Sequence, residues 1–165
     1  MAKHTDSLTY MVTTVPGFEP VAISEICQSL DNAWIQNQLR GRVLFNTTSS
    51  WEDLQNLKSV DNIYQHIAWL KAGPHKVHLA QLSEDIDALP LGDMNFINTP
   101  EGSRQFIVNA RRSGQHTFSR FDAAKAVEES LIKTHGFWLG TMEEHNLNFR
   151  LDIIQKDALL SLKLT

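Results

Sequence analysis

The chain has 165 residues, of which 42% are hydrophobic, 21% charged and 8% aromatic, enough for one ordinary domain or two small ones with a packed core. This composition excludes disordered, collagen-like and coiled-coil chains. The single cysteine, Cys27, excludes an internal disulfide and a cysteine-rich zinc site, and it fits a reducing, cytoplasmic location. The longest stretch without a charged residue, 7–18, is too short and too polar for a membrane span, so no membrane partner is expected.

The net charge of −4 is distributed unevenly along the chain. Residues 1–103 contain 6 Lys and Arg against 12 Asp and Glu, and residues 126–165 contain 4 against 6. Residues 104–125 contain 5 against 1, a local charge of +4. Because binding responds to the local potential, this basic segment predicts an anion-binding surface on an otherwise acidic chain.

Strand and helix signals alternate in the first half of the chain. A β-rich run over 8–13 stops before the turn at Pro16-Gly17, which predicts a strand. Apolar residues then recur every four positions from Phe18 to Leu30, which predicts an amphipathic helix. Further signals predict a strand over 34–38, a strand over 43–46, a short helix over 51–57 and a strand over 63–70. The order βαββαβ is that of a ferredoxin-like domain.

The pattern restarts after Gly73-Pro74, which predicts two domains, residues 1–73 and residues 74–165. In the second domain the signals predict a helix over 79–89, a polar loop over 92–102, a buried strand at 106–108 and a loop over 111–117. A helix opens at Ser119, with Asp122 placed to complete a capping box. Two last strands, over 147–153 and 160–164, form a hairpin with one buried face.

Motifs for catalysis or metal binding are missing from this pattern. There is no Walker loop, no Gly-rich dinucleotide motif, no nucleophile elbow and no pair of carboxylates in a plausible cleft. His75 and His78 are spaced to share a helix face, but no third ligand stands at a matching spacing. We therefore expect neither catalytic residues nor a metal site in this chain.

The basic segment combines several groups that bind phosphate. Arg111 and Arg112 are expected at the end of a strand, Gly114 in a tight bend and Arg120 at a helix start with free N–H groups. Two rings lie between these cations, at positions 116 and 118. Either ring could stack on an unpaired base, but core packing of the Phe and a backbone hydrogen bond from Nδ1 of the His are equally open interpretations.

The run Arg112-x-Gly114-x-His116-x-Phe118-Ser119, between a buried strand and a helix, resembles the core of the THUMP domain of RNA-modifying enzymes. The segments 15–19 (Val-Pro-Gly-Phe-Glu) and 41–45 (Gly-Arg-Val-Leu-Phe) are similar to the ferredoxin-like domain that precedes THUMP in a branch of RNA guanine-N2 methyltransferases. Together the resemblance covers nearly the whole chain. The 4-thiouridine synthases also join these two domains, but their usual Arg-Tyr-Gly-Glu type start is missing, which favours the methyltransferase branch.

The resemblance implies an α+β fold, an N-terminal ferredoxin-like βαββαβ domain followed by an α/β THUMP domain ending in a β-hairpin. It also implies a tRNA-binding module for the acceptor stem and single-stranded 3′ end. An S-adenosylmethionine-dependent methyltransferase domain is expected after residue 165, so the cofactor is expected there and none in this chain. The predicted RNA-binding residues, five from the motif and the others from charge, are Arg104, Arg111, Arg112, Gly114, His116, Phe118, Ser119, Arg120 and Lys125.

Two alternatives stay open at this point. The same module could serve an rRNA guanine methyltransferase. The chain could also be a stand-alone ferredoxin-like protein whose arginines bind a phosphate-bearing ligand, or an oligomerisation module. In either RNA interpretation the acidic N-terminal domain is expected to act as a spacer more than as the main contact.

Overall fold

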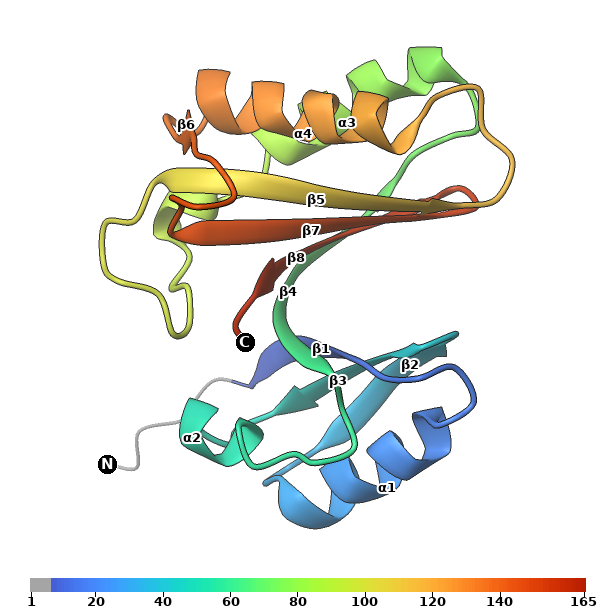
Figure 1. Ribbon diagram of the computed structural model, residues 1–165, viewed down its shortest axis with the longest axis vertical. Helices are drawn as coiled ribbons and strands as arrows, with labels where there is room; N and C mark the ends of the chain where they lie inside the picture. The colour runs from blue at the N-terminus through green and yellow to red at the C-terminus, as the bar shows by residue number, and fades with distance from the viewer. Residues whose placement is uncertain (1–6) are drawn as a thin grey trace. The chain divides into compact units, whose positions relative to one another are not determined.

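The computed structural model describes residues 7–165, which form two compact units (Figure 1). Unit 1 contains the described residues up to His66 together with Lys163–Thr165, and unit 2 contains Ile67–Leu162. The division passes through strand β4 (Asn62–Lys71), which supplies residues to both units. The domain boundary predicted at residue 73 stays a prediction. Residues 1–6 of the predicted first domain, 1–73, lie outside the described part of the chain.

Unit 1 has the βαββαβ order that the sequence predicts. Its strands hydrogen-bond in the order β2-β3-β1-β4, with each neighbouring pair antiparallel. Both helices lie on the same side of this sheet (Figure 1). The elements that precede β4 are β1 (Leu8–Thr13), α1 (Glu19–Ser29), β2 (Trp34–Leu39), β3 (Arg42–Thr47) and α2 (Trp51–Leu54). Helix α2 is shorter than the predicted 51–57.

The side chain of Glu19 joins two turns of unit 1. Its Oε1 accepts a hydrogen bond of 2.7 Å from the Gly41 N–H, and its Oε2 accepts one of 2.8 Å from the Gly17 N–H. Both glycines have positive φ, and a Cβ at Gly41 would lie 3.2 Å from the Thr14 carbonyl oxygen. The two N-terminal segments that carry the family resemblance are therefore tied together by one buried carboxylate, which gives them a structural role.

We expect Glu19→Gln to destabilise the protein at neutral pH and to matter much less in acid. The hydrogen bond from Gly41, then the backbone of Glu19 itself, holds the pKa of this carboxyl below its usual value against the opposing effect of burial. A carboxyl whose pKa is lower in the folded than in the unfolded state stabilises the folded protein at pH values above its unfolded pKa. This contribution is lost as the pH falls through the folded pKa. Urea midpoints at pH 7 and about pH 3 measure this, with Glu52→Gln as the exposed control. An equal effect of Glu19→Gln at both pH values contradicts it.

Unit 2 places two helices on one face of a mixed sheet. The strand order is β4-β8-β7-β5-β6, in which β5 runs parallel to β7 and β6, and β7 and β8 form an antiparallel hairpin. Helices α3 and α4 lie side by side over the sheet (Figure 1). The elements are a 3-10 helix (Lys76–His78), α3 (Leu79–Asp87), a second 3-10 helix (Leu91–Asp93), β5 (Gln105–Ser113), α4 (Arg120–Lys133), β6 (Trp138–Leu139), β7 (Leu147–Ile154) and β8 (Asp157–Lys163).

Two sequence predictions for unit 2 need correction. The sequence predicts one buried face for the hairpin, but both faces are buried, and Arg150 and Asp152 form an ion pair of 2.8 Å on the second of them. Strand β5 continues to Ser113, so Arg111 and Arg112 lie at the end of a strand, as expected for the basic segment, and the loop predicted over 111–117 begins only after Ser113. The parallel register with β7, which pairs Arg112 with Ile153, extends the strand beyond its apolar part.

Candidate functional site

Three segments of unit 2 meet where β5 ends. The Gln155 N–H donates to the Ser113 carbonyl at 2.9 Å, which joins the β7–β8 turn to the end of β5. The Thr117 N–H donates to the Pro74 carbonyl at 2.8 Å, and the Lys76 N–H donates to Thr117 Oγ1 at 2.8 Å. We call residues 71–78, 111–125 and 154–157 together the basic end.

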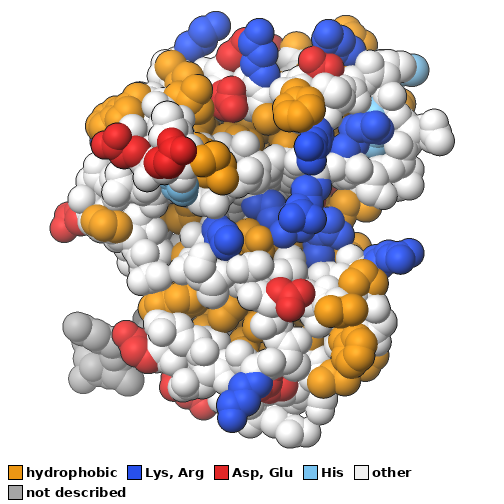
Figure 2. Space-filling model, viewed as in Figure 1, with side chains coloured by type: hydrophobic (Ala, Val, Ile, Leu, Met, Phe, Trp, Pro, Cys, Tyr) orange, Lys and Arg blue, Asp and Glu red, His pale blue; other side chains and the backbone are white. Residues whose placement is uncertain are grey.

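The basic end contains seven Lys and Arg against two Asp, a net charge of +5 in a chain whose total is −4. On the face drawn in Figure 2, most Lys and Arg side chains lie in the upper part, over unit 2. Two of the seven cations have carboxylate partners, since Lys71 pairs with Asp157 at 2.6 Å and Lys76 lies 3.9 Å from Asp122. The other five are exposed, namely Arg111, Arg112, Arg120, Lys125 and Lys156. This surplus of positive charge attracts anions.

His116 holds the loop after β5 in place. Its Nε2 donates to the Gln155 carbonyl, and its Nδ1 accepts a 3.0 Å hydrogen bond from Nη1 of Arg112. We assign the neutral Nε2–H tautomer, since a carbonyl can only accept and a guanidinium can only donate. The hydrogen bond from Nδ1 to the local backbone considered from the sequence is not formed, because Nδ1 accepts from Arg112 while Nε2 bonds to a carbonyl 39 positions along the chain.

Gly114 allows the loop to approach the β7–β8 turn closely. Its φ is +114°, and a Cβ built there would lie 2.7 Å from Oε1 of Gln155. The Gly114 carbonyl also accepts a 3.1 Å hydrogen bond from Nη1 of Arg112. The tight bend predicted at Gly114 is therefore present, and it packs against Gln155 of the β7–β8 turn. The bend also fixes the position of the Arg112 guanidinium.

The start of α4 has the predicted capping box. Ser119 Oγ accepts from the Asp122 N–H at 3.1 Å, and Asp122 Oδ2 accepts from the Ser119 N–H at 2.9 Å. The hydrogen bond from the Ser119 N–H lowers the pKa of Asp122, and burial opposes this shift only in part. Asp122 therefore places a carboxylate at the helix start. Because that carboxylate already lies at the helix start, an anion at the basic end would be attracted by the cationic side chains more than by the helix N–H groups.

Phe118 packs in the core of unit 2. Its side chain is 3% exposed and belongs to the same apolar cluster as Ala123 and Val127 of α4. Its ring centroid lies 4.9 Å from that of His116. Of the two interpretations left open by the sequence, the structure shows core packing, so this ring supports the loop from below and is not presented for stacking.

Arg104 lies away from the other predicted site residues. It directly precedes β5, whereas Arg112 lies near its end, a separation of roughly 25 Å at about 3.3 Å per strand residue. Its Nη1 donates to the His135 carbonyl at 3.4 Å, and its guanidinium carbon lies 5.8 Å from the centre of the Phe137 ring. With the loop over 91–103 it lines a separate hollow of about 420 Å³.

Sequence reasoning missed four residues of the basic end. Lys71, Lys76 and Lys156 are distant from the basic segment in the sequence, and only the folding of unit 2 brings them to it. Phe121 lies within the basic segment and is 70% exposed. Residue type alone does not tell an exposed phenylalanine from one that packs in the core.

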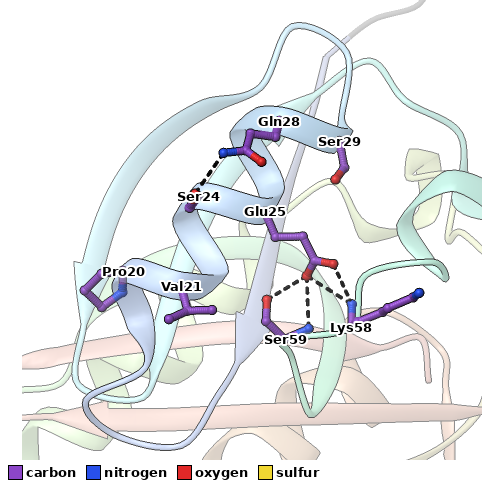
Figure 3. A pocket seen from close by; sticks show the side chains of 8 residues that line it. All are labelled: Pro20, Val21, Ser24, Glu25, Gln28, Ser29, Lys58 and Ser59. Atoms are coloured by element: carbon purple, nitrogen blue, oxygen red, sulfur yellow. Dashed lines mark hydrogen bonds between the residues drawn. The ribbon is translucent and has the colours of Figure 1, made fainter.

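A shallow hollow of about 610 Å³ lies beside α1 in unit 1 (Figure 3). Its carboxylate, Glu25, accepts hydrogen bonds from the Lys58 N–H, the Ser59 N–H and the Ser59 hydroxyl. Desolvation acts to raise the pKa of Glu25, but these hydrogen bonds outweigh it and leave that pKa below its usual value. The carboxylate thus ties α1 to the 58–59 segment and is not poised for proton transfer.

Groups suited to metal binding or to a membrane are not found in the described residues. Between residues 7 and 165, no three or more His, Cys, Asp or Glu side chains are grouped to hold a metal ion. Nδ1 of His78 accepts a 3.1 Å hydrogen bond from the His75 N–H, which uses one of the nitrogens considered as a ligand. Every helix in this part of the chain is too short or too polar to cross a membrane.

The fold is that of several solved structures. TrmN from Thermus thermophilus superposes with a TM-score of 0.76 and 24% identity, over 96% of this chain and 46% of TrmN. A protein from Listeria monocytogenes described as a predicted N6-adenine-specific DNA methylase gives 0.71 and 16%, over 96% of this chain and 40% of that one. A 4-thiouridine synthetase, solved as an RNA complex with bound ATP, gives 0.58 and 12%, over 96% and 42%.

These likenesses define the class of fold, and they confirm the α+β architecture in which a ferredoxin-like βαββαβ unit is followed by an α/β unit ending in a hairpin. The chain spans less than half of each of these three structures. No protein-family model matches the sequence, and no curated protein matches it.

Proposed function

We propose that this chain is an RNA-binding module that holds the acceptor arm and 3′ end of tRNA for an S-adenosylmethionine-dependent guanine-N2 methyltransferase domain of the same protein. The observation that carries the proposal is the basic end, where five exposed cations form no ion pair in the described residues and surround a loop of fixed conformation, although Lys125 also lies near the Asp122 and Glu128 carboxyls. RNA phosphates are the ligand class that such a surface attracts.

The neighbours in fold support the same proposal. TrmN and the Listeria methylase are each about twice as long as this chain, and the synthetase was solved with RNA. A methylase in which one part has this fold would use that part for binding and the remainder for chemistry. We place the guanine-N2 activity and the tRNA acceptor arm in the proposal on the resemblance of the sequence motifs.

The methyl donor is proposed to bind in that other domain. A Rossmann-type cradle needs a glycine-rich turn whose backbone can approach the cofactor. In the turn between β5 and α4 the space beside Gly114 is filled by Gln155, and in the turn before α1 the Gly17 N–H is already bonded to Glu19. Both observations support placing the methyl donor outside these two turns.

Replacing Arg111 and Arg112 with alanine tests the proposal. Even-numbered residues of β5 face the helices, so these neighbours point to opposite faces and are expected to contact different phosphates. The double variant should weaken tRNA binding and reduce the slope of log affinity against log salt by about 0.7 to 0.9 for each phosphate that is no longer neutralised. Filter binding between about 50 and 200 mM salt, concentrations at which such slopes are resolved, measures both quantities.

The matched control removes two exposed cations of unit 1, Arg40→Ala with Lys58→Ala. Arg111→Ala alone separates charge from loop structure, because Arg112 also bonds to the loop at Gly114 and His116. Equal weakening by the control pair would place the RNA surface on unit 1. Binding of a free nucleotide that tRNA does not displace would instead favour the stand-alone phosphate-binding protein.

A further inference from the structure

We infer that Phe121 is the surface on which an unpaired RNA base stacks, with Arg120 and Lys125 beside it to contact the flanking phosphates. This inference rests on the proposed function and adds the residue that would read a single-stranded end. It also transfers the stacking role from Phe118, which the fold buries, to the neighbouring phenylalanine that the fold exposes.

Exposure is the first observation that supports this inference. Phe121 is 70% exposed, more than any other aromatic side chain of residues 7–165. It occupies the second position of α4, and its backbone therefore belongs to a regular helix whose start is held by the capping box at Ser119. The ring is thus presented from a rigid element, and base stacking gains most from a surface that is already in place.

Charge is the second observation. The guanidinium carbon of Arg120 lies 4.9 Å from the centre of the Phe121 ring, so a cation is already in contact with it. Lys125 is four residues further along the helix, a spacing that puts it on the same face as Phe121. An aromatic ring with one cation against it and a second on the same helix face suits a nucleotide, whose base is planar and whose phosphates are anionic.

The strongly exposed tryptophans have different surroundings. Trp34 follows Ala33 and precedes Ile35, and Trp138 lies between Phe137 and Leu139. Neither has a Lys or Arg next to it in the sequence, although the Trp138 N–H donates to the Arg104 carbonyl at 3.1 Å. An apolar patch of that kind suits a protein partner, whereas Phe121 is set within the most basic part of the chain.

The low burial of Phe121 also makes the test clean. Truncating an exposed side chain near the start of a helix is expected to leave the unfolding midpoint nearly unchanged. Phe121→Ala is therefore compared with the unaltered protein, with Phe121→Trp and with Trp138→Ala, an exposed aromatic outside the basic end. The probes are a tRNA transcript and the same transcript with abasic sites at its unpaired 3′ nucleotides, both measured by filter binding over a range of salt.

We expect Phe121→Ala to weaken binding of the intact transcript by about 5-fold to 150-fold, the range for removal of one stacked base. The salt slope should stay the same, because the cations that bind phosphate are all retained. Phe121→Trp should retain the affinity, Trp138→Ala should bind like the unaltered protein, and Phe121→Ala should have little effect with the abasic transcript.

Several results would overturn the inference. If Phe121→Ala binds within twofold of the unaltered protein while the Arg111 and Arg112 variant is weakened, the proposed function stands and the stacking role is wrong. A reduced salt slope in Phe121→Ala would mean that the ring only positions a cation. An equal weakening in Phe121→Trp, or an equal weakening with the abasic transcript, would exclude stacking, and a chain that binds no RNA would overturn both proposals.

Discussion

Phe118→Ala is expected to lower the free energy of unfolding by about 3–5 kcal/mol, the cost of removing a buried aromatic side chain from a packed core. Phe118 is 3% exposed and belongs to the cluster that joins α4 to the sheet of unit 2. Because small domains are stable by only about 5–15 kcal/mol in total, this is a large fraction of the whole. Urea unfolding followed by circular dichroism measures it.

The matched control lies three residues away. Phe121→Ala removes the same atoms from a side chain that is 70% exposed, and it should change the stability by no more than about 0.5 kcal/mol. Any weakening of RNA binding by Phe118→Ala should follow from the loosened loop and should diminish at lower temperature. A Phe118→Ala protein of normal stability with weakened RNA binding would mean that this ring contacts the RNA after all.

The second large effect concerns the RNA. A tRNA trimmed of its unpaired 3′ nucleotides should bind more weakly by about 1–3 kcal/mol, the contribution of one stacked base. The phosphates of a single-stranded end can reach the cations of the basic end while one base is free to lie on a ring. A duplex cannot present that base unless its helix opens, so the weakening is expected to be specific to the unpaired end.

The control for this measurement is a tRNA shortened by the same number of nucleotides within its anticodon loop. Its affinity should equal that of the intact molecule, because the removed phosphates are distant from the acceptor arm. If the trimmed and intact tRNA bind equally, the module does not read the 3′ end and the basic end is a sequence-independent backbone contact. If the anticodon-loop variant is weakened as much as the trimmed one, the acceptor arm is the wrong part of the tRNA.

Local sequence patterns predicted the elements well. The four-residue apolar repeat over 18–30 is α1, and the alternation over 8–13 is β1. Ser119 and Asp122 predicted the start of α4, because a capping box involves only groups within one turn of the chain. Patterns failed where pairing depends on a distant strand, as in the extension of β5 along β7 to Ser113 and in the two-residue strand β6.

The sequence by itself determined the central part of the candidate site, since the cluster of Arg and the Gly114 to Ser119 motif are visible without a structure. Only the tertiary structure decided which of these groups act together. It joined Lys76 and Lys156 to the cluster and left Arg104 at the other end of β5.

The same holds for the two phenylalanines, at positions 118 and 121. Each ring lies close to cations in the sequence, but their burial differs. Phe118 precedes the N-cap Ser119 and lies under the loop, whereas Phe121 follows the cap and points outward. Which side of the chain faces the core is a property of packing between α4 and the sheet. Residue type and spacing alone cannot supply it, since the contacts that bury Phe118 come from elements far away in the sequence.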